Sequence, residues 1–249
     1  MKRKYVILCS LLMIASMVLA ACGAGDATST VEATSEATTA PVAENTPSSP
    51  ASSSDLVLDP ANVADSEAVT YLYEGLVRLQ DGSVTGALAE SYTVSEDGLD
   101  YIFNLRPGVT FHDGTALNAD IVVQNFNRWF DPSDANRGSG EFAAWAENFG
   151  GFKGELTDEG KAKSIYDGIE KVNDFTVLVH LNTTDADFLT KLSNPAFSIV
   201  NPNSFNGGDG GTGAYKFASL SGSTATLEPF AEYWDKAAVP TANVEVTIE

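Results

Sequence analysis

The chain has 249 residues and carries 14 Lys and Arg against 34 Asp and Glu, which gives a formal net charge of −20 at pH 7. An acidic surface of this kind repels nucleic acid and anionic lipid headgroups, so proteins that bind nucleic acid through a basic face are excluded. Hydrophobic residues make up 43% of the chain, and only two residues are cysteines. Residues 55–249 are therefore long enough for one domain with a substantial core, and the cysteine content does not indicate a disulfide-rich fold.

The amino-terminal residues have the pattern of a lipoprotein leader. A basic segment, 2–4, precedes a run of about 17 apolar residues, which is at the lower limit for a membrane span. Small residues then precede Cys22, which is typical of a cleavage site at which the cysteine becomes the first residue and its thiol takes a diacylglyceryl group. We therefore predict a signal peptide at 1–21 and a lipid on Cys22. The alternative is an ordinary secretory signal with an incidental cysteine.

Residues 22–54 are predicted to be a lipidated, disordered tether. From 23 onward this segment is mostly Ser, Thr, Ala, Pro and Glu, and it contains no aromatic residue, Leu or Ile. It cannot bury enough apolar surface to offset the entropy lost on ordering. A flexible chain of this length has a root-mean-square end-to-end distance of about 30 Å. The expected location is therefore the outer face of the cell membrane, extracellular or periplasmic, with the lipid as the only membrane contact.

The first predicted elements after the tether are a helix and a hairpin. Asp65 or Ser66 is expected to cap the helix, whose apolar stripe consists of Val69, Leu72, Tyr73 and Leu76. In 100–105, every second residue is apolar, which is typical of a half-buried strand, and 91–94 is expected to pair with it. Pro107 and Gly108 end this strand, after which Val109 and Phe111 resume the alternation.

Helices and hairpins also alternate in the rest of the chain. Asn118 is expected to cap a helix that runs to Trp129, and an apolar cluster predicts a short helix over 142–149. Asp185 is expected to cap a further helix. The predicted strands share the period of two and lie at 165–172, 175–181, 215–220, 224–227 and 244–249.

Several of these segments together resemble the extracellular solute-binding proteins of ABC transporters, in the oligopeptide, dipeptide and nickel family. The longest match is the run 99–123, in which Arg106-Pro107-Gly108 and Phe111-His112-Asp113-Gly114 recur at the family's spacing. The other matching motifs occur in the family's order and are Leu58-Asp59-Pro60, Tyr73-Glu74-Gly75-Leu76-Val77, Ala87–Tyr92, Gly211–Tyr215, and the spacing of Leu227, Phe230, Tyr233 and Trp234.

The resemblance implies a mixed α/β fold, namely a type II periplasmic-binding-protein-like lobe with an inserted subdomain. It implies an incomplete first lobe made of 55–74 and 206–249, and a subdomain at 75–205. Because members of the family are longer than this chain, we expect a truncated, amino-terminal portion in which the second lobe is absent.

The implied function is that of a lipid-anchored, substrate-binding component of an ABC importer. Such a protein captures an oligopeptide or a similar solute, closes around it and delivers it to the permease subunits. The resemblance implies a monomer that is not an enzyme and that does not bind nucleic acid. Two alternatives stay open at this point: a secreted or surface hydrolase, and a surface adhesion lipoprotein fragment without independent activity.

Catalytic and metal motifs are missing from the sequence. No G-x-S-x-G, C-x-x-C or H-E-x-x-H pattern is present, so we predict no catalytic residue, no metal site and no cofactor. A nickel chelate held by aromatic side chains stays open. His112 beside Asp113 could form half of a catalytic pair, but its turn predicts an exposed side chain. The glycines of 208–213 formally fit G-x-G-x-x-G, but a strand follows them, so a crossover between lobes is expected rather than a nucleotide site.

The predicted ligand-binding residues lie in three segments and are Asp65, Ser66, Tyr73, Phe142, Trp145, Gly211, Thr212 and Gly213. Phe142 and Trp145 are the best candidates, because aromatic faces stack on planar amides; the alternative is that they belong to the subdomain core. For Asp65 and Ser66 the alternative is helix capping. Tyr73 and Glu74 are expected chiefly to pack the helix and to form a buried ion pair or hydrogen bond, with cleft lining as the alternative.

Overall fold

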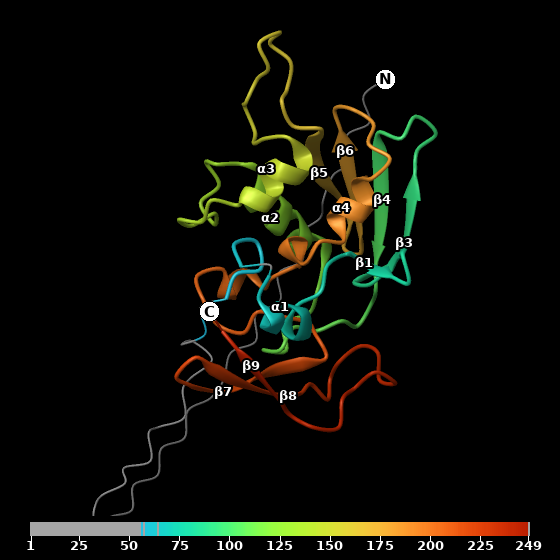
Figure 1. The fold of residues 1–249 in the computed structure, drawn as a ribbon. Helices are drawn as coiled ribbons and strands as arrows, with labels where there is room; N and C mark the ends of the chain where they lie inside the picture. Colours follow the sequence, from blue (N-terminus) through green and yellow to red (C-terminus); the bar gives the residue numbers. More distant parts are fainter. Residues whose placement is uncertain (1–55, 57, 64, 249) are drawn as a thin grey trace, which may run out of the picture. The chain divides into compact units, whose positions relative to one another are not determined.

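The computed structural model describes residues 56, 58–63 and 65–248 of the protein (Figure 1). The predicted signal peptide, the tether and the lipid attachment at Cys22 lie outside this part. Within it, no helix has the length and hydrophobicity needed to cross a membrane.

The larger sheet has four antiparallel strands in the order β3-β4-β6-β5. In this order they are β3 (Ala89–Val94), β4 (Asp100–Leu105), β6 (Thr176–Leu181) and β5 (Tyr166–Asn173). The alternation predicted for β4 is confirmed, since Tyr101, Phe103 and Leu105 are buried. Both predicted hairpins, β3-β4 and β5-β6, are present. The period-two pattern therefore identified the face of the sheet that packs against the core.

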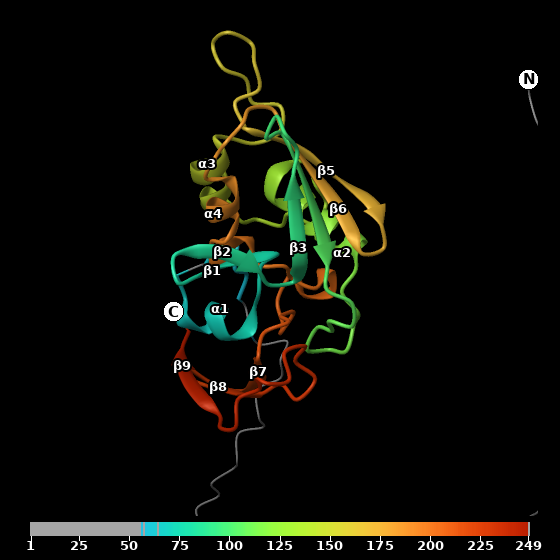
Figure 2. The same cartoon turned by 90° about the vertical axis from the view of Figure 1, so that its right-hand side faces the viewer.

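Three helices accompany this sheet, and they are α2 (Ala119–Phe130), α3 (Ala143–Phe149) and α4 (Phe188–Leu192). Helix α2 packs against β5 and β6, as Figure 2 shows. Its predicted cap is confirmed, because the Asn118 side chain accepts a hydrogen bond from the backbone N–H of Ile121 at 3.0 Å. The short helix predicted near Trp145 is α3. The cap predicted at Asp185 is displaced: Asp187 is the N-cap, and the Asp185 carboxylate accepts from its backbone N–H.

A second sheet has the order β7-β8-β9 and is antiparallel. Its strands are β7 (Tyr215–Ser221), β8 (Thr224–Pro229) and β9 (Val244–Thr247). Helix α1 (Glu67–Leu72) packs against β7 and β9. The predicted N-cap position is confirmed at Ser66, but its side chain makes no cap hydrogen bond. Two short 3-10 helices, η2 (Pro195–Phe197) and η3 (Pro202–Ser204), precede this sheet in the chain.

The sequence interpretation missed one hairpin and assigned one strand wrongly. Strands β1 (Val77–Gln80) and β2 (Ser83–Gly86) pair around Asp81-Gly82. Both turn residues have positive φ, at 50° and 75°, which is the geometry that an Asp-Gly hairpin turn requires. Val109 and Phe111 are buried as expected, but they lie in a turn with one isolated bridge, Thr110 to Ala116, rather than in a strand.

The buried apolar side chains form two separate clusters. The first is built around the four-stranded sheet and its helices and includes Phe103, Phe126 and Trp145. The second joins α1 to the β7-β8-β9 sheet and includes Leu72 and Leu227. The chain passes from the second cluster to the first near Gly75 and returns near Val200. Both crossings lie next to the cavity described below.

Candidate functional site

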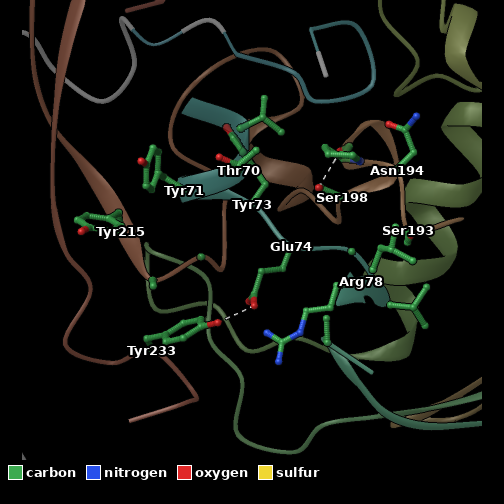
Figure 3. Close-up of a pocket in the computed structure, with 18 of the residues that line it drawn as sticks. Thr70, Tyr71, Tyr73, Glu74, Arg78, Ser193, Asn194, Ser198, Tyr215 and Tyr233 are labelled. Atoms are coloured by element: carbon green, nitrogen blue, oxygen red, sulfur yellow. Dashed lines mark hydrogen bonds between the residues drawn. The ribbon is translucent and has the colours of Figure 1, made fainter. Parts of the chain in front are cut away.

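A cavity of about 760 Å³ opens where the carboxyl end of α1 meets β1, α4 and the segment before β7 (Figure 3). This volume is in the range of sites for small ligands. The lining combines apolar, aromatic and polar side chains. The polar and aromatic ones are Thr70, Tyr71, Tyr73, Glu74, Arg78, Thr190, Ser193, Asn194, Ser198, Tyr215 and Tyr233. Of the predicted ligand-binding residues, Tyr73 and Gly213 line this cavity.

The carboxylate of Glu74 is the acceptor at the centre of a hydrogen-bond cluster in this wall. Tyr233 donates its hydroxyl to Oε1 at 2.8 Å, and Trp234 donates Nε1 to Oε2 at 3.0 Å. Thr212 donates Oγ1 to Oε2 at 3.2 Å. These four residues are called the Glu74 cluster below. It joins the motif that contains Glu74 to two motifs that lie 138 to 160 residues further along the chain.

The environment of Glu74 favours its neutral form, although its donors favour the charged form. Burial raises the pKa of the Glu74 carboxyl above its ordinary value of 4.5, while the hydrogen bonds from Trp234, Tyr233 and Thr212 lower it. The positive charge of Arg78 lowers this pKa as well. Burial, together with the Glu74 charge, raises the pKa of the Tyr233 hydroxyl, so Tyr233 stays a donor at every physiological pH.

The glycines at 211 and 213 are required by close backbone packing against α1. A Cβ on Gly211 would lie 1.8 Å from the Leu72 carbonyl oxygen, and a Cβ on Gly213 would lie 2.2 Å from the Tyr71 carbonyl oxygen. The Gly213 N–H donates to the Leu72 carbonyl at 2.9 Å. Thr212 is fully buried between them and reaches Glu74. Close approach therefore explains the glycines of this crossover, and of the three residues only Gly213 lines the cavity.

His112 is buried, so the prediction of an exposed side chain is wrong. Its Nδ1 lies 2.5 Å from Asp209 Oδ1, and its Nε2 lies 3.0 Å from the Gly213 carbonyl oxygen. Asp209 also accepts from the backbone N–H of Phe217 at 2.7 Å. Sequence reasoning could not find this pair, because Asp209 is 97 residues away. Both ring nitrogens are occupied by structural partners and neither faces a nucleophile, so the pair fixes the crossover rather than forming part of a triad.

Phe142 and Trp145 do not reach this cavity. Trp145 is 1% exposed and packs against six aromatic rings. This group, called the aromatic core below, comprises Phe126, Trp129, Phe130, Trp145, Phe149, Tyr166 and Phe197. Phe142 is also 1% exposed, and the guanidinium groups of Arg128 and Arg137 stack on its ring at 5.3 and 4.3 Å. The geometry supports the alternative, namely that these residues stabilise the fold.

Asp65 and Phe142 meet at a second, smaller cavity of about 450 Å³. Asn62 lies there as well, and its side-chain oxygen accepts from the backbone N–H of Phe142 at 3.2 Å. Ser66 lies at neither cavity, and its hydroxyl is buried without a partner among the described residues. Seven of the eight predicted residues therefore divide between the two cavities, the aromatic core and the crossover, and the eighth, Ser66, lies at the start of α1.

The sequence analysis did not identify many of the residues that line the larger cavity. Ser193, Asn194 and Ser198 line it from α4 and η2, and Arg78 lines it from the unpredicted strand β1. The Asp81-Gly82 turn was the signal that could have placed Arg78 on a hairpin. Nothing in the sequence marks the three polar residues around Pro195, since their position depends on how α4 packs beside β1.

Titratable side chains that could bind a metal do not gather anywhere in the described part of the chain, where no group of three or more His, Cys, Asp or Glu has suitable geometry. An ion pair joins α2 to the segment before α1. Arg128 on α2 is 1% exposed at its side chain and forms a 2.5 Å contact with Asp59.

Comparison with known proteins gives consistent matches. Residues 83–248 match the family model of bacterial extracellular solute-binding proteins, family 5. A glutathione-binding protein GsiB of Pectobacterium atrosepticum is 33% identical over 195 residues, which cover 74% of this chain and 34% of that protein. A heme-binding protein A of Haemophilus influenzae is 37% identical over 138 residues, which cover 51% and 23%.

Among solved structures, the ABC transporter-associated periplasmic binding protein DppA of Helicobacter pylori, in complex with the peptide STSA, matches with a TM-score of 0.56 and 26% identity. The match covers 76% of this chain and 40% of that one. The chain thus spans about a third of the length of the curated relatives it matches. The expected mixed α/β fold of the type II binding-protein class is confirmed, and because the family model covers more than half of the chain, the protein belongs to the bacterial extracellular solute-binding proteins of family 5.

Proposed function

We propose that this chain supplies one wall of the solute-binding cleft of an ABC importer's receptor, and that the cavity beside Glu74 is where the solute is contacted. The observation that carries this proposal is the convergence of the Tyr73–Val77, Gly211–Tyr215 and Tyr233-Trp234 motifs on one cavity wall. Aromatic rings there offer apolar area, and the surrounding polar groups can orient a ligand.

The position of the cavity also fits a protein that closes around its ligand. It lies where the chain passes between its two hydrophobic clusters, which supports the proposed division into a first lobe at 55–74 and 206–249 and a subdomain at 75–205. A ligand that contacts both sides of a cleft stabilises the closed state over the open one. We propose that the opposing wall comes from the lobe that the longer relatives possess.

The proposed solute is an oligopeptide or a similarly sized molecule, and the proposed partners are the permease subunits of the importer. Relatives that bind glutathione, heme and a peptide support this size class without selecting one member. The receptor is proposed to act as a monomer and to have no enzymatic activity.

We further propose that the receptor is held at the outer membrane face through a lipid on Cys22, with 22–54 as a flexible tether. Metabolic labelling with a radioactive fatty acid tests this. Label should enter the wild-type protein and be absent from Cys22→Ser, whereas label that survives the substitution would contradict the anchor.

Calorimetry on the full-length gene product tests the binding function. We expect micromolar or tighter binding to one class in a panel of trialanine, glutathione, heme, a nickel–histidine chelate and maltotriose. The released solute should be unchanged when the mixture is analysed by mass spectrometry. No measurable binding to any member of the panel would contradict the proposal, and cleavage of the solute would favour the hydrolase alternative.

The same panel applied to residues 55–249 alone tests whether the second wall is needed. We expect binding at least about tenfold weaker than that of the full-length gene product, because loss of the contacts on one side removes well over 1.4 kcal/mol of binding energy. Equal affinities would show that this chain binds its solute without an opposing lobe.

A further inference from the structure

Arg78 differs from every other basic side chain in the part of the chain that the structure describes. The lysines all form ion pairs. Arg128 pairs with Asp59, Arg137 donates to backbone carbonyls, and Arg106 donates to the Ala87 carbonyl and stacks on Trp234. Arg78 alone has no hydrogen bond, ion pair or aromatic ring as a partner among these residues. In a chain with a net charge of −20, a cation without a carboxylate partner is unexpected.

The unpaired guanidinium lies in the wall of the larger cavity. Arg78 is in β1 opposite Thr85, and it is the only basic residue among those that line the cavity. Figure 3 shows the Arg78 side chain next to Glu74, whose carboxylate the Tyr233 hydroxyl also approaches. The Glu74 oxygens already accept from Tyr233, Trp234 and Thr212. Glu74 and Arg78 form no direct ion pair, although the positive charge of Arg78 acts on the Glu74 carboxyl and lowers its pKa.

The neutral polar groups nearby are also occupied. Ser198 donates its hydroxyl to the Pro195 carbonyl at 2.8 Å, and Ser193 donates to the Thr190 carbonyl at 2.7 Å. The Asn194 side chain accepts from the backbone N–H of Ala196 at 2.9 Å. Arg78 is thus the group in this wall with the most unused donors. A guanidinium presents five N–H donors in a planar fork, whose geometry matches the two oxygens of a carboxylate.

We propose that Arg78 binds a carboxylate of the solute, so that the receptor selects molecules with a carboxylate at the end that enters this part of the cavity. This inference rests on the proposed function, because it assigns a role within the same cavity. The acidic surface repels anions at long range, and a local cation is what lets an anionic group settle there. The neighbouring Tyr233 and Tyr215 would contact the apolar part of the same molecule.

The test compares trialanine with trialanine amide, which differ only in the terminal carboxylate. Affinities are measured by calorimetry on the full-length gene product. The wild type should bind the acid about 10- to 100-fold more tightly than the amide, as expected for a bidentate charged hydrogen bond. Arg78→Gln should weaken binding of the acid by the same factor and leave the amide unchanged. The affinity of Arg78→Lys for the acid should lie between those of the wild type and Arg78→Gln, since lysine keeps the charge but loses the two-pronged donor geometry.

Lys161→Gln is the matched control. It removes the same charge from an exposed ion pair with Glu159 outside the cavity, and it should leave both affinities unchanged. Arg78→Gln should unfold cooperatively and close to the wild-type temperature, since the exposed side chain makes no hydrogen bond or ion pair and loses only the action of its charge on Glu74.

The outcomes separate the two proposals. Equal binding of acid and amide by the wild type, or a preference that survives Arg78→Gln, would overturn the role of Arg78 and leave the solute-binding function intact. Binding of no probe in the whole panel would overturn the binding function and the role of Arg78 with it.

Discussion

Trp145 and Trp234 both lie in aromatic surroundings, but their indole N–H groups meet different environments. Trp145 sits in the aromatic core, where its Nε1 is buried and has no partner among the described residues. Trp234 is only partly buried, and its Nε1 donates to Glu74 beside the larger cavity. The guanidinium of Arg106 stacks on the Trp234 ring, 4.1 Å from its centre. The two tryptophans thus differ in the partner of the indole N–H: that of Trp234 donates to a residue of the cavity wall, whereas that of Trp145 is buried in the core without a hydrogen bond among the described residues.

The largest expected effect is the loss of the core indole. Trp145→Ala should lower the free energy of unfolding by about 3–5 kcal/mol, because it removes a fully buried ring and leaves a cavity. Urea unfolding followed by circular dichroism measures this. A loss below about 1.5 kcal/mol would mean that Trp145 is not part of the core, and the comparison between the two tryptophans would fail.

Adding a single methyl group to the crossover beside Glu74 should lower the free energy of unfolding almost as much as Trp145→Ala does. Gly211→Ala should cost about 2–3 kcal/mol, because the added Cβ would meet the Leu72 carbonyl oxygen. Gly168→Ala in β5 is the matched control, since a Cβ there has open space around it, and it should change stability by less than about 0.5 kcal/mol. Similar losses in the two variants would show that close packing does not explain Gly211.

Removing one hydroxyl from the Glu74 cluster and one from the aromatic core compares the two regions directly. Tyr233→Phe deletes a donor to the Glu74 carboxylate and should cost about 1.5–3 kcal/mol. Tyr166→Phe deletes a buried hydroxyl that has no partner among the described residues, so it should be neutral or slightly stabilising. Thermal unfolding of the two variants measures the difference, and the reverse order of stability would contradict the assignment of the two clusters.

The smallest expected effect is a change in how the free energy of unfolding depends on pH when Glu74 is replaced by Gln. Because burial raises the pKa of Glu74 in the folded protein, its contribution to stability is fully present below about pH 4.5, the ordinary pKa, and is lost as the pH rises through the folded pKa. Glu74→Gln cannot titrate. The stability of the wild type relative to this variant should therefore fall as the pH rises above about 4.5. Urea unfolding at a series of pH values tests this, and a constant difference would contradict a raised pKa.

Local patterns in the sequence predicted most of the elements but little of the site. The alternation in β4 and the cap at Asn118 depend on neighbouring residues, so they can be recognised from spacing alone. The contact of His112 with Asp209, and that of Glu74 with Trp234, join residues 97 and 160 positions apart. Such contacts depend on how the two hydrophobic clusters pack against each other, and no short sequence pattern predicts that packing.

The family resemblance located the right motifs without assigning their roles. It marked Phe142 and Trp145 as ligand residues because aromatic rings are good binding surfaces, yet these rings fill the core. It marked Tyr73 and Gly213, which line the cavity, and treated Glu74 as a packing residue with a buried hydrogen bond, which it also has. Arg78 escaped notice because an unpaired cation can be recognised only when the partners of all the others are known.

The central claim is that solute is contacted beside Glu74 and not beside Trp145. The three tryptophans of the chain allow one direct measurement, because each indole N–H gives its own signal in a ¹⁵N–¹H correlation spectrum. Signals are assigned by Trp→Phe substitution, and trialanine or glutathione is added to the full-length gene product. We predict that the Trp234 signal shifts on binding while those of Trp129 and Trp145 stay in place. A shift of the Trp145 signal with no change at Trp234 would contradict the account.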